Sequence, residues 1–184
     1  MLILNLRWMG GPVRKTAPAL PKKEIVMGIT GKTHDISQDV EVIQSALAGE
    51  HAGIAAYRIA GGSGLLVPDT LKVALLFKSH HEGHRDALAK LISDIGVTPV
   101  APKSDDDYVS ELKLGALKSQ ADILSLATTL ERGAASGYIS RISSIRDSGL
   151  SQLFAQISAD EMIHWTTLNG VIGGSLPAEP FQFG

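Results

Sequence analysis

Cysteine is absent from this 184-residue chain, and aromatic side chains make up only 5% of it. Without cysteine there are no disulfides, thiolate metal sites, iron–sulfur clusters or thiol nucleophiles. The compartment stays open, because both reducing and oxidising environments tolerate a cysteine-free protein. Since 44% of the residues are hydrophobic, the core must consist mainly of Ala, Leu, Ile and Val, which favours closely packed helices.

Two further features that would indicate a macromolecular or membrane partner are missing. The net charge is only −2, and no run of basic residues interleaved with aromatic ones occurs, so we expect no nucleic-acid partner. No apolar run is long enough to span a bilayer, so we expect no membrane span. The length suits one domain with a substantial core.

Residues 1–32 are the least regular part of the chain, with adjacent glycines, prolines and scattered basic residues but no sustained periodicity. We interpret this segment as a flexible arm or as the product of a mis-set translation start, with Met27 as the alternative start. An export signal needs a continuous apolar stretch, and residues 2–9 are too short and are interrupted by polar side chains. No signal peptide is recognisable, so the location stays open between cytoplasm and periplasm. The domain itself is expected over residues 33–184.

Hydrophobic periodicity predicts four long helices separated by glycine- and proline-containing connections. Their expected ranges are about 35–60, 68–95, 119–145 and 147–172. Asp35 or Ser37 is expected to cap the first helix, and Pro68 to open the second. Residues 97–107 are expected to form a long solvated connection, followed by a short helix near residues 110–117.

Six polar residues lie on the apolar faces of the four long helices, where a polar group should be absent. They are Glu50, His81, His84, Glu131, Glu161 and His164. A buried carboxylate or imidazole is costly unless it is paired or bound to a metal ion. Two residues three apart on one helix project from the same face, so both can reach the same ion. The six residues are therefore candidate ligands of a metal pair inside a four-helix bundle.

The donor set also restricts the metal. Carboxylate oxygens and imidazole nitrogens, with no thiolate among them, favour iron or manganese, with zinc as the alternative. Carboxylates can bridge two ions, whereas imidazoles take terminal positions. We therefore expect two iron ions as the cofactor, with manganese or zinc as alternatives, and metal ions are the partners that the sequence indicates.

The two halves of the chain resemble each other around these residues. The segment EHAGIAAY at 50–57 aligns with ERGAASGY at 131–138, and each places a tyrosine seven residues after its glutamate. The glutamate precedes the first chelating residue by 31 residues in the first half and by 30 in the second. Two such halves, related by a pseudo-twofold axis, would bring six ligands to one centre. Tyr57 and Tyr138 are interpreted as core residues whose hydroxyls hydrogen-bond near the metal, with a catalytic redox role as the alternative.

Five more polar residues lie beside the predicted ligands. His51 is expected in the second coordination sphere or on the surface. His80 and Glu82 flank the polar face of the second helix, and Glu82 would replace a ligand only if the register shifted. Asp86 and Asp160 either orient ligand imidazoles from the second sphere or are exposed surface residues.

Two segments carry a resemblance to a known family, HHEGHRDAL at 80–88 and DEMIHW at 160–165. With them, residues 35–183 resemble the bacterial ferritin-like domain proteins of the ferritin-like and rubrerythrin-like di-iron carboxylate superfamily. The resemblance implies an all-α, up-down-down-up four-helix bundle with a long crossover between the second and third helices. The connection at 97–107 is where that crossover belongs.

One position departs from the pattern of the wider superfamily, which has Glu-x-x-His on both chelating helices. Here the first chelating residue of the second helix is His81. The replacement removes one bridging carboxylate and leaves three carboxylates with three imidazoles. Because fewer negative ligands stabilise two ferric ions less well, a mononuclear site or an asymmetric pair becomes an alternative. The bridging role then passes to Glu161 or to water.

The six-residue set and the resemblance predict a ferritin-like metal-binding protein. We expect a non-haem di-iron or di-manganese oxidoreductase that uses oxygen or peroxide, as an oxidase, peroxidase or ferroxidase. The alternative is a non-catalytic structural or interaction module with a degenerate or zinc-filled site, which the histidine replacement favours. An iron-storage cage is less favoured, because no shell-forming helix is evident. A homodimer through exposed Ala and Gly surfaces of the first two helices is a further hypothesis.

Overall fold

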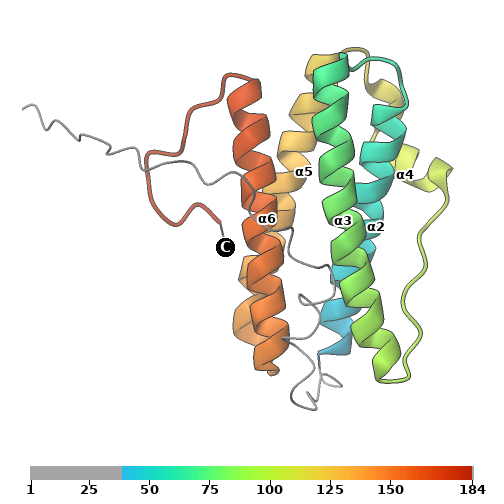
Figure 1. Ribbon diagram of the computed structural model, residues 1–184, viewed down its shortest axis with the longest axis vertical. Coiled ribbons are helices and arrows are strands. Elements are labelled where there is room, and N and C mark those ends of the chain that lie inside the picture. The colour runs from blue at the N-terminus through green and yellow to red at the C-terminus, as the bar shows by residue number, and fades with distance from the viewer. Residues whose placement is uncertain (1–38, 184) are drawn as a thin grey trace, which may run out of the picture. The chain divides into compact units, whose positions relative to one another are not determined.

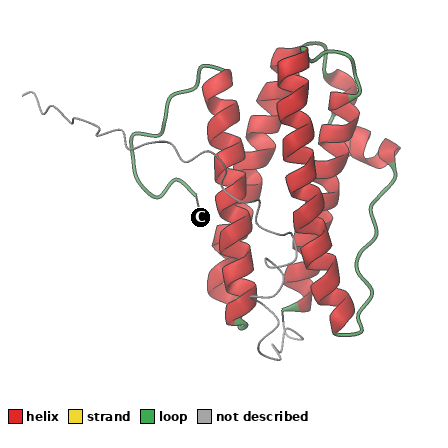
Figure 2. Ribbon diagram, in the orientation of Figure 1, coloured by secondary structure: helices red, strands yellow, loops and turns green. Residues whose placement is uncertain are grey.

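The computed structural model describes residues 39–183, and within that range the chain forms helices and no strand (Figure 2). The elements are α2 (Val40–Gly61), α3 (Pro68–Asp94), α4 (Asp105–Glu111), η1 (Leu114–Ala116), α5 (Gln120–Arg141), η2 (Ile142–Ser144) and α6 (Ser148–Val171). The expected arm at 1–32 and the proposed caps Asp35 and Ser37 lie outside the described residues. The all-α prediction is confirmed. None of the helices in residues 39–183 has the length and apolarity needed to cross a membrane.

The four long helices α2, α3, α5 and α6 form a bundle in which they run up, down, down and up in chain order (Figure 1). Helices α2 and α3 pack as one antiparallel hairpin, and α5 and α6 pack as another. The connection from residue 95 to residue 119 runs back along the bundle and carries α4 and η1. It is the crossover that was predicted between the second and third long helices.

The starts of three long helices follow from local chemistry. Pro68 stands at the first position of α3, where its missing N–H costs no hydrogen bond. The Ser119 hydroxyl accepts a hydrogen bond of 3.2 Å from the Asp122 N–H and caps α5. The Asp147 carboxylate accepts one of 2.7 Å from the Leu150 N–H and caps α6. These local features fix where three of the four long helices begin.

The short helix predicted near residues 110–117 lies earlier in the structure. Ser104 and Asp107 form a reciprocal capping box, in which each side chain accepts from the other's backbone N–H, and this box starts α4 at residue 105. Lys113 then adopts a φ of 55°, in the left-handed region, and separates α4 from η1. The third long helix ends at Arg141, earlier than predicted, and continues as η2.

Two apolar clusters hold the bundle together. One consists of Ile43, Leu47, Leu88, Ile92, Tyr138, Leu150, Phe154 and Ile157. The other consists of Phe77, Leu124 and Leu168. The candidate ligands lie between the two clusters along their helices, as His81 and His84 do between Phe77 and Leu88 on α3. Hydrophobic burial on both sides therefore supplies the stability that lets polar residues occupy the middle.

Asp39 joins the two helical hairpins near the start of α2. Its side chain is 2% exposed and makes no cap to α2 itself. Instead the carboxylate accepts hydrogen bonds from the Arg146 N–H at 3.2 Å and from the Asp147 N–H at 3.1 Å, in the connection between α5 and α6. The carboxylate thus satisfies backbone donors at the start of α6 that the helix cannot satisfy itself.

Replacing Asp39 with alanine should destabilise the bundle. The change removes the acceptor of two part-buried backbone hydrogen bonds, each of which typically contributes about 0.5–1.5 kcal/mol. Urea unfolding followed by circular dichroism measures this. Glu41→Ala, an exposed acidic residue in the first turn of the same helix, is the matched control. Equal unfolding midpoints for the two variants would show that the Asp39 contacts carry no stability.

Candidate metal centre

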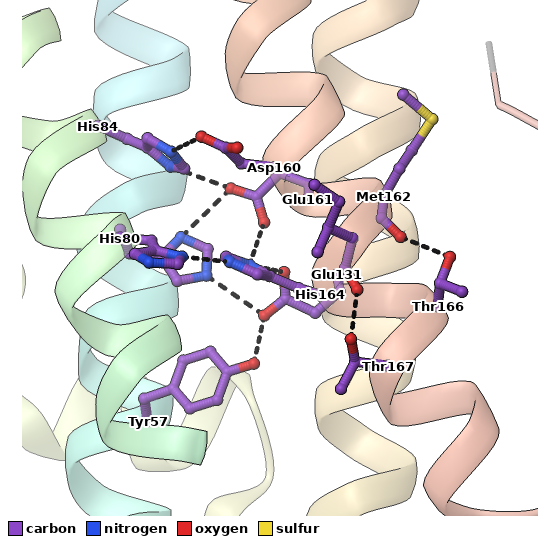
Figure 3. A network of polar contacts seen from close by, with 12 residues as sticks. Tyr57, His80, His84, Glu131, Asp160, Glu161, Met162, His164, Thr166 and Thr167 are labelled. Carbon is purple, nitrogen blue, oxygen red and sulfur yellow. Dashed lines mark hydrogen bonds and ion pairs between the residues drawn. The ribbon is translucent and has the colours of Figure 1, made fainter. Parts of the chain in front are cut away.

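The six predicted ligands converge at the centre of the bundle. Figure 3 labels four of them: His84, Glu131, Glu161 and His164. Helices α2 and α5 each provide one glutamate, and α3 and α6 each provide a pair three residues apart. The residues are Glu50 on α2, His81 and His84 on α3, Glu131 on α5, and Glu161 and His164 on α6. None of the six is more than 9% exposed. The i and i+3 spacing on α3 and α6 places both members of each pair on the inward face.

His81 occupies the middle of this cluster. Its Nδ1 lies 2.7 Å from Glu50 Oε2 and 3.5 Å from Glu161 Oε1. Its Nε2 lies 3.3 Å from Glu131 Oε1. One imidazole therefore contacts all three carboxylates, with its two ring nitrogens directed at different glutamates.

The donor atoms fall into two groups of four that share two residues. One group is Glu50, His81, His84 and Glu161, and the other is His81, Glu131, Glu161 and His164. Within each group the donor atoms lie within 4.8 Å of one another. This spacing allows all four atoms of a group to approach one ion with small adjustments of their side chains. A pair of neighbouring ions requires two such groups with residues in common, and here both groups contain His81 and Glu161.

Two buried atoms within residues 39–183 support this fit to a metal. His84 Nδ1 and Glu161 Oε1 make no hydrogen bond, although they lie 3.2 Å apart. A buried polar atom without a hydrogen bond typically costs about 1–3 kcal/mol. A cation between these atoms would coordinate both. The nitrogen and oxygen donors also match the preferences of iron, manganese and zinc.

Two tyrosines bind the carboxylates of the opposite half of the chain. The Tyr57 hydroxyl, on α2, donates to Glu131 Oε1 on α5 (Figure 3). The Tyr138 hydroxyl, on α5, donates to Glu50 Oε1 on α2. Burial and the nearby carboxylates raise the pKa of both hydroxyls well above the ordinary value, so both stay protonated donors. The exchange is reciprocal, as expected for two halves related by a pseudo-twofold axis.

The outer nitrogens of two histidines also have partners at equivalent positions. His84 Nε2 lies 3.2 Å from Asp160 Oδ2, and His164 Nε2 lies 2.9 Å from His80 Nδ1 (Figure 3). Asp160 and His80 each stand one residue before the first chelating residue of their own helix. A partner on the outer nitrogen fixes the orientation of a ligand imidazole. Asp160 thus contacts a predicted ligand and is also exposed at the surface, with 51% of its side chain accessible.

His80 is a functional contact that sequence reasoning missed, since it was identified only as flanking the polar face. The alignment of the two halves held the signal, because residue 80 is the counterpart of Asp160. Glu82 instead pairs with Lys78 at 2.5 Å, and Asp86 pairs with Arg85 at 2.8 Å. The described contacts of both lie outside the centre.

The carboxylates carry different proton affinities. Burial raises the pKa of each, but at Glu50 the contacts with His81 and His84 outweigh burial and lower the pKa to about 2. The pKa of Glu131 is lowered by its imidazole neighbours in the same way. At Glu161, which is fully buried, burial prevails and the pKa is raised. Of the three carboxylates, Glu161 is therefore the one whose negative charge depends most on a nearby cation.

The imidazoles hold their protons strongly when no metal is bound. Burial lowers the pKa of His84, but the carboxylates of Glu161 and Glu50 outweigh it and raise the pKa to about 10. The pKa values of His81 and His164 are raised by the carboxylates that face them. A metal ion must therefore displace protons from this centre, because only a neutral imidazole can coordinate.

Comparison with known proteins identifies the family. The sequence profile of the ferritin-like domain matches residues 38–174, so the chain belongs to the ferritin-like domain family. A crystal structure of a conserved hypothetical protein from Mycobacterium tuberculosis has a similar fold, with a TM-score of 0.61 and 22% identity. The match covers 79% of this chain and 97% of that one. No curated protein sequence matches the chain at a significant level. The predicted resemblance is thereby confirmed at the level of family and fold.

Metal binding should tighten as the pH rises. Because the imidazole pKa values lie above their ordinary range, a bound ion replaces protons near neutral pH, and affinity should rise by about tenfold per pH unit for each proton released. Calorimetric titration with Zn²⁺ in two buffers of different ionisation enthalpy counts these protons. His51→Ala should not alter the count, since His51 bonds the Val100 carbonyl outside the centre. Equal heats in both buffers would contradict the proton exchange.

Proposed function

We propose that this member of the ferritin-like domain family is a non-haem di-metal oxidoreductase that uses oxygen or peroxide. The observation that carries the proposal is the pair of buried four-residue groups that share His81 and Glu161. Glu50 and His84 would hold one ion, and Glu131 and His164 the other. Two iron or manganese ions, when bound, would supply one-electron redox chemistry toward the oxidant.

The chain's own residues would orient these ligands and control protons. Tyr57 holds a proton at Glu131 Oε1, while Glu131 Oε2 lies 3.2 Å from His164 Nδ1. Tyr138 holds a proton at Glu50 Oε1, while Glu50 Oε2 faces His81. Glu50 and Glu131 thus each have one oxygen bound by a tyrosine and the other directed at an imidazole. This arrangement supports a role for both tyrosines in ligand positioning, and a redox role remains the alternative.

A second candidate function is a structural or interaction module that needs no metal, and the position of His81 favours it. A protonated His81 between Glu50 and Glu131, at 2.7 Å and 3.3 Å, would neutralise buried carboxylates without an ion. In that case the bundle would be stable without metal, and an added ion would compete with the imidazolium. The two candidates therefore differ in how metal content and stability respond to variants of the centre.

Metal content tests the first proposal directly. Native protein should contain about two iron or manganese ions per chain, and Glu131→Ala should lose most of them, because one group loses a carboxylate. Elemental analysis measures the content, and oxygen consumption on adding ferrous iron measures the activity. Glu82→Ala is the matched control, an acidic residue beside His81 that bonds Lys78 instead. A native protein that contains no metal, and that is no more stable when metal is added, would favour the structural module.

Restoring the missing carboxylate gives a second test. His81→Glu should raise the affinity for a second ion, because four carboxylates neutralise two divalent ions better than three do. Titration with ferrous iron under exclusion of oxygen should show the second ion binding at least tenfold more tightly than in the unmodified protein. The same substitution at position 51, His51→Glu, controls for added charge outside the two groups, since His51 bonds the Val100 carbonyl. An unchanged second affinity in His81→Glu would count against a two-ion centre.

A further inference from the structure

An apolar cleft of about 560 Å³ lies between α2 and α5. It extends along α2 from Ser45 to Gly61, and along α5 from Arg141 back to Ile123. At 1.5 Å per residue this corresponds to a length of roughly 25 Å. The volume falls within the range typical of small-molecule sites in proteins, about 300–1,000 Å³.

The cleft exists because both helices present small residues to each other. The lining residues of this kind are Gly49, Ala52, Gly53 and Ala56 on α2, and Ala127, Gly133, Ala134 and Gly137 on α5. A Cβ atom built at Gly49 or at Gly133 would meet nothing within 4 Å, which shows open space above both positions. Glycine inside a helix costs about 1 kcal/mol relative to alanine. Both glycines are exposed, so they stand at the open side of the cleft.

The cleft reaches the candidate metal centre. Glu50, Glu131 and His81 form part of its wall, together with the two tyrosines that bind the glutamates. Most of the remaining lining consists of aliphatic side chains such as Leu66 and Leu124. A molecule in this cleft would contact hydrocarbon along most of its length, with charged groups at the metal centre and at the two ends. This distribution fits an apolar chain better than a sugar, a nucleotide or a peptide backbone, which need hydrogen bonds throughout.

One end of the cleft carries a cation. Arg141 lines the cleft, is partly buried, and donates from Nη1 to the Gly137 carbonyl at 2.5 Å. Within residues 39–183 no carboxylate pairs with it, whereas Arg58 and Arg85 are paired with aspartates. Asp69 lines the opposite end. An anionic group is therefore attracted to the Arg141 end and repelled from the other.

We propose that the cleft binds a fatty acid, with its carboxylate at Arg141 and its alkyl chain directed along α5 toward Leu124. The guanidinium is held beside Gly137. Glu131 lies ten residues from Arg141 on the same helix, a rise of roughly 15 Å, so carbons near the middle of the alkyl chain would lie closest to the metal centre. A guanidinium forms strong charge-assisted hydrogen bonds with a carboxylate. The fatty acid is the substrate only if the proposed oxidoreductase function holds, whereas its binding does not depend on that function.

Binding to the full-length, metal-free protein tests the proposal. Hexadecanoate, measured by displacement of a fluorescent fatty acid, should bind one molecule per chain. Gly133→Leu and Gly49→Leu should each weaken binding at least tenfold, because the leucine side chain fills the cleft. Both variants gain helix propensity and should fold. Gly83→Leu is the matched control, since a Cβ there also meets nothing within 4 Å but Gly83 lies on the exposed face of α3 outside the cleft.

The charged end is tested separately. Arg141→Gln should weaken hexadecanoate binding about tenfold, the typical effect of losing one charge-assisted hydrogen bond, and should leave 1-hexadecanol binding unchanged. The proposal would be overturned if the full chain bound no hexadecanoate, or if both cleft-filling variants bound it unchanged. It would also be overturned if the protein formed a dimer that Gly133→Leu dissociates, because a second copy of the chain would then occupy the cleft. Metal content, measured on the same samples, separates fatty-acid binding from the proposed oxidoreductase function. Hexadecanoate binding by protein that takes up no metal would refute the oxidoreductase alone.

Discussion

Three carboxylates and three imidazoles buried inside one helical bundle impose the constraint on which the rest of the structure depends. Each carboxylate would cost several kcal/mol if it were buried without a partner. The bundle meets this cost by placing every carboxylate against an imidazole, with His81 in contact with all three. The arrangement is costly if any member is lost, and it leaves His84 Nδ1 and Glu161 Oε1 without hydrogen bonds. A cation is the group that would complete it.

The surrounding fold can be understood as support for this centre. The polar residues occupy the middle of each long helix, so the apolar contacts that stabilise the bundle are divided between two clusters. The chain must also bring helices from both halves into register. The Asp39 carboxylate does so at one end of the bundle by binding backbone N–H groups between α5 and α6. The crossover with α4 allows the second hairpin to start at the end where α3 starts.

Much of the centre could be predicted because its signals are local. The pairs three residues apart on α3 and α6 identify inward faces from the sequence alone, and the matched segments at 50–57 and 131–138 relate the two halves. Helix starts at Pro68 and Ser119 also depend on adjacent residues. The start of α4 was equally local, in the Ser104 capping box. It was missed because prolines and consecutive aspartates nearby were interpreted as a solvated connection.

Other features depend on how helices pack and could not be predicted from sequence. His80 lies beside the polar face of α3, and only the position of α6 brings its ring to His164. The cleft depends on the distance between α2 and α5, which the sequence does not specify. The small residues along these helices indicated a close approach of a partner helix as readily as an open space. Glycine and alanine stripes therefore predict a site only after the interhelical distance is known.

The two halves differ most in the partners of their outer histidine nitrogens. Each group of four contains two carboxylates and two imidazoles, because His81 and Glu161 are shared. Behind these groups, however, His84 faces the carboxylate of Asp160, whereas His164 faces His80. A carboxylate partner makes an imidazole a stronger donor than a second imidazole does. For a pair of ions held as proposed, the ion at His84 would thus receive more electron density than the ion at His164. The asymmetry of this centre therefore arises in Asp160 and His80, the residues that contact the ligands.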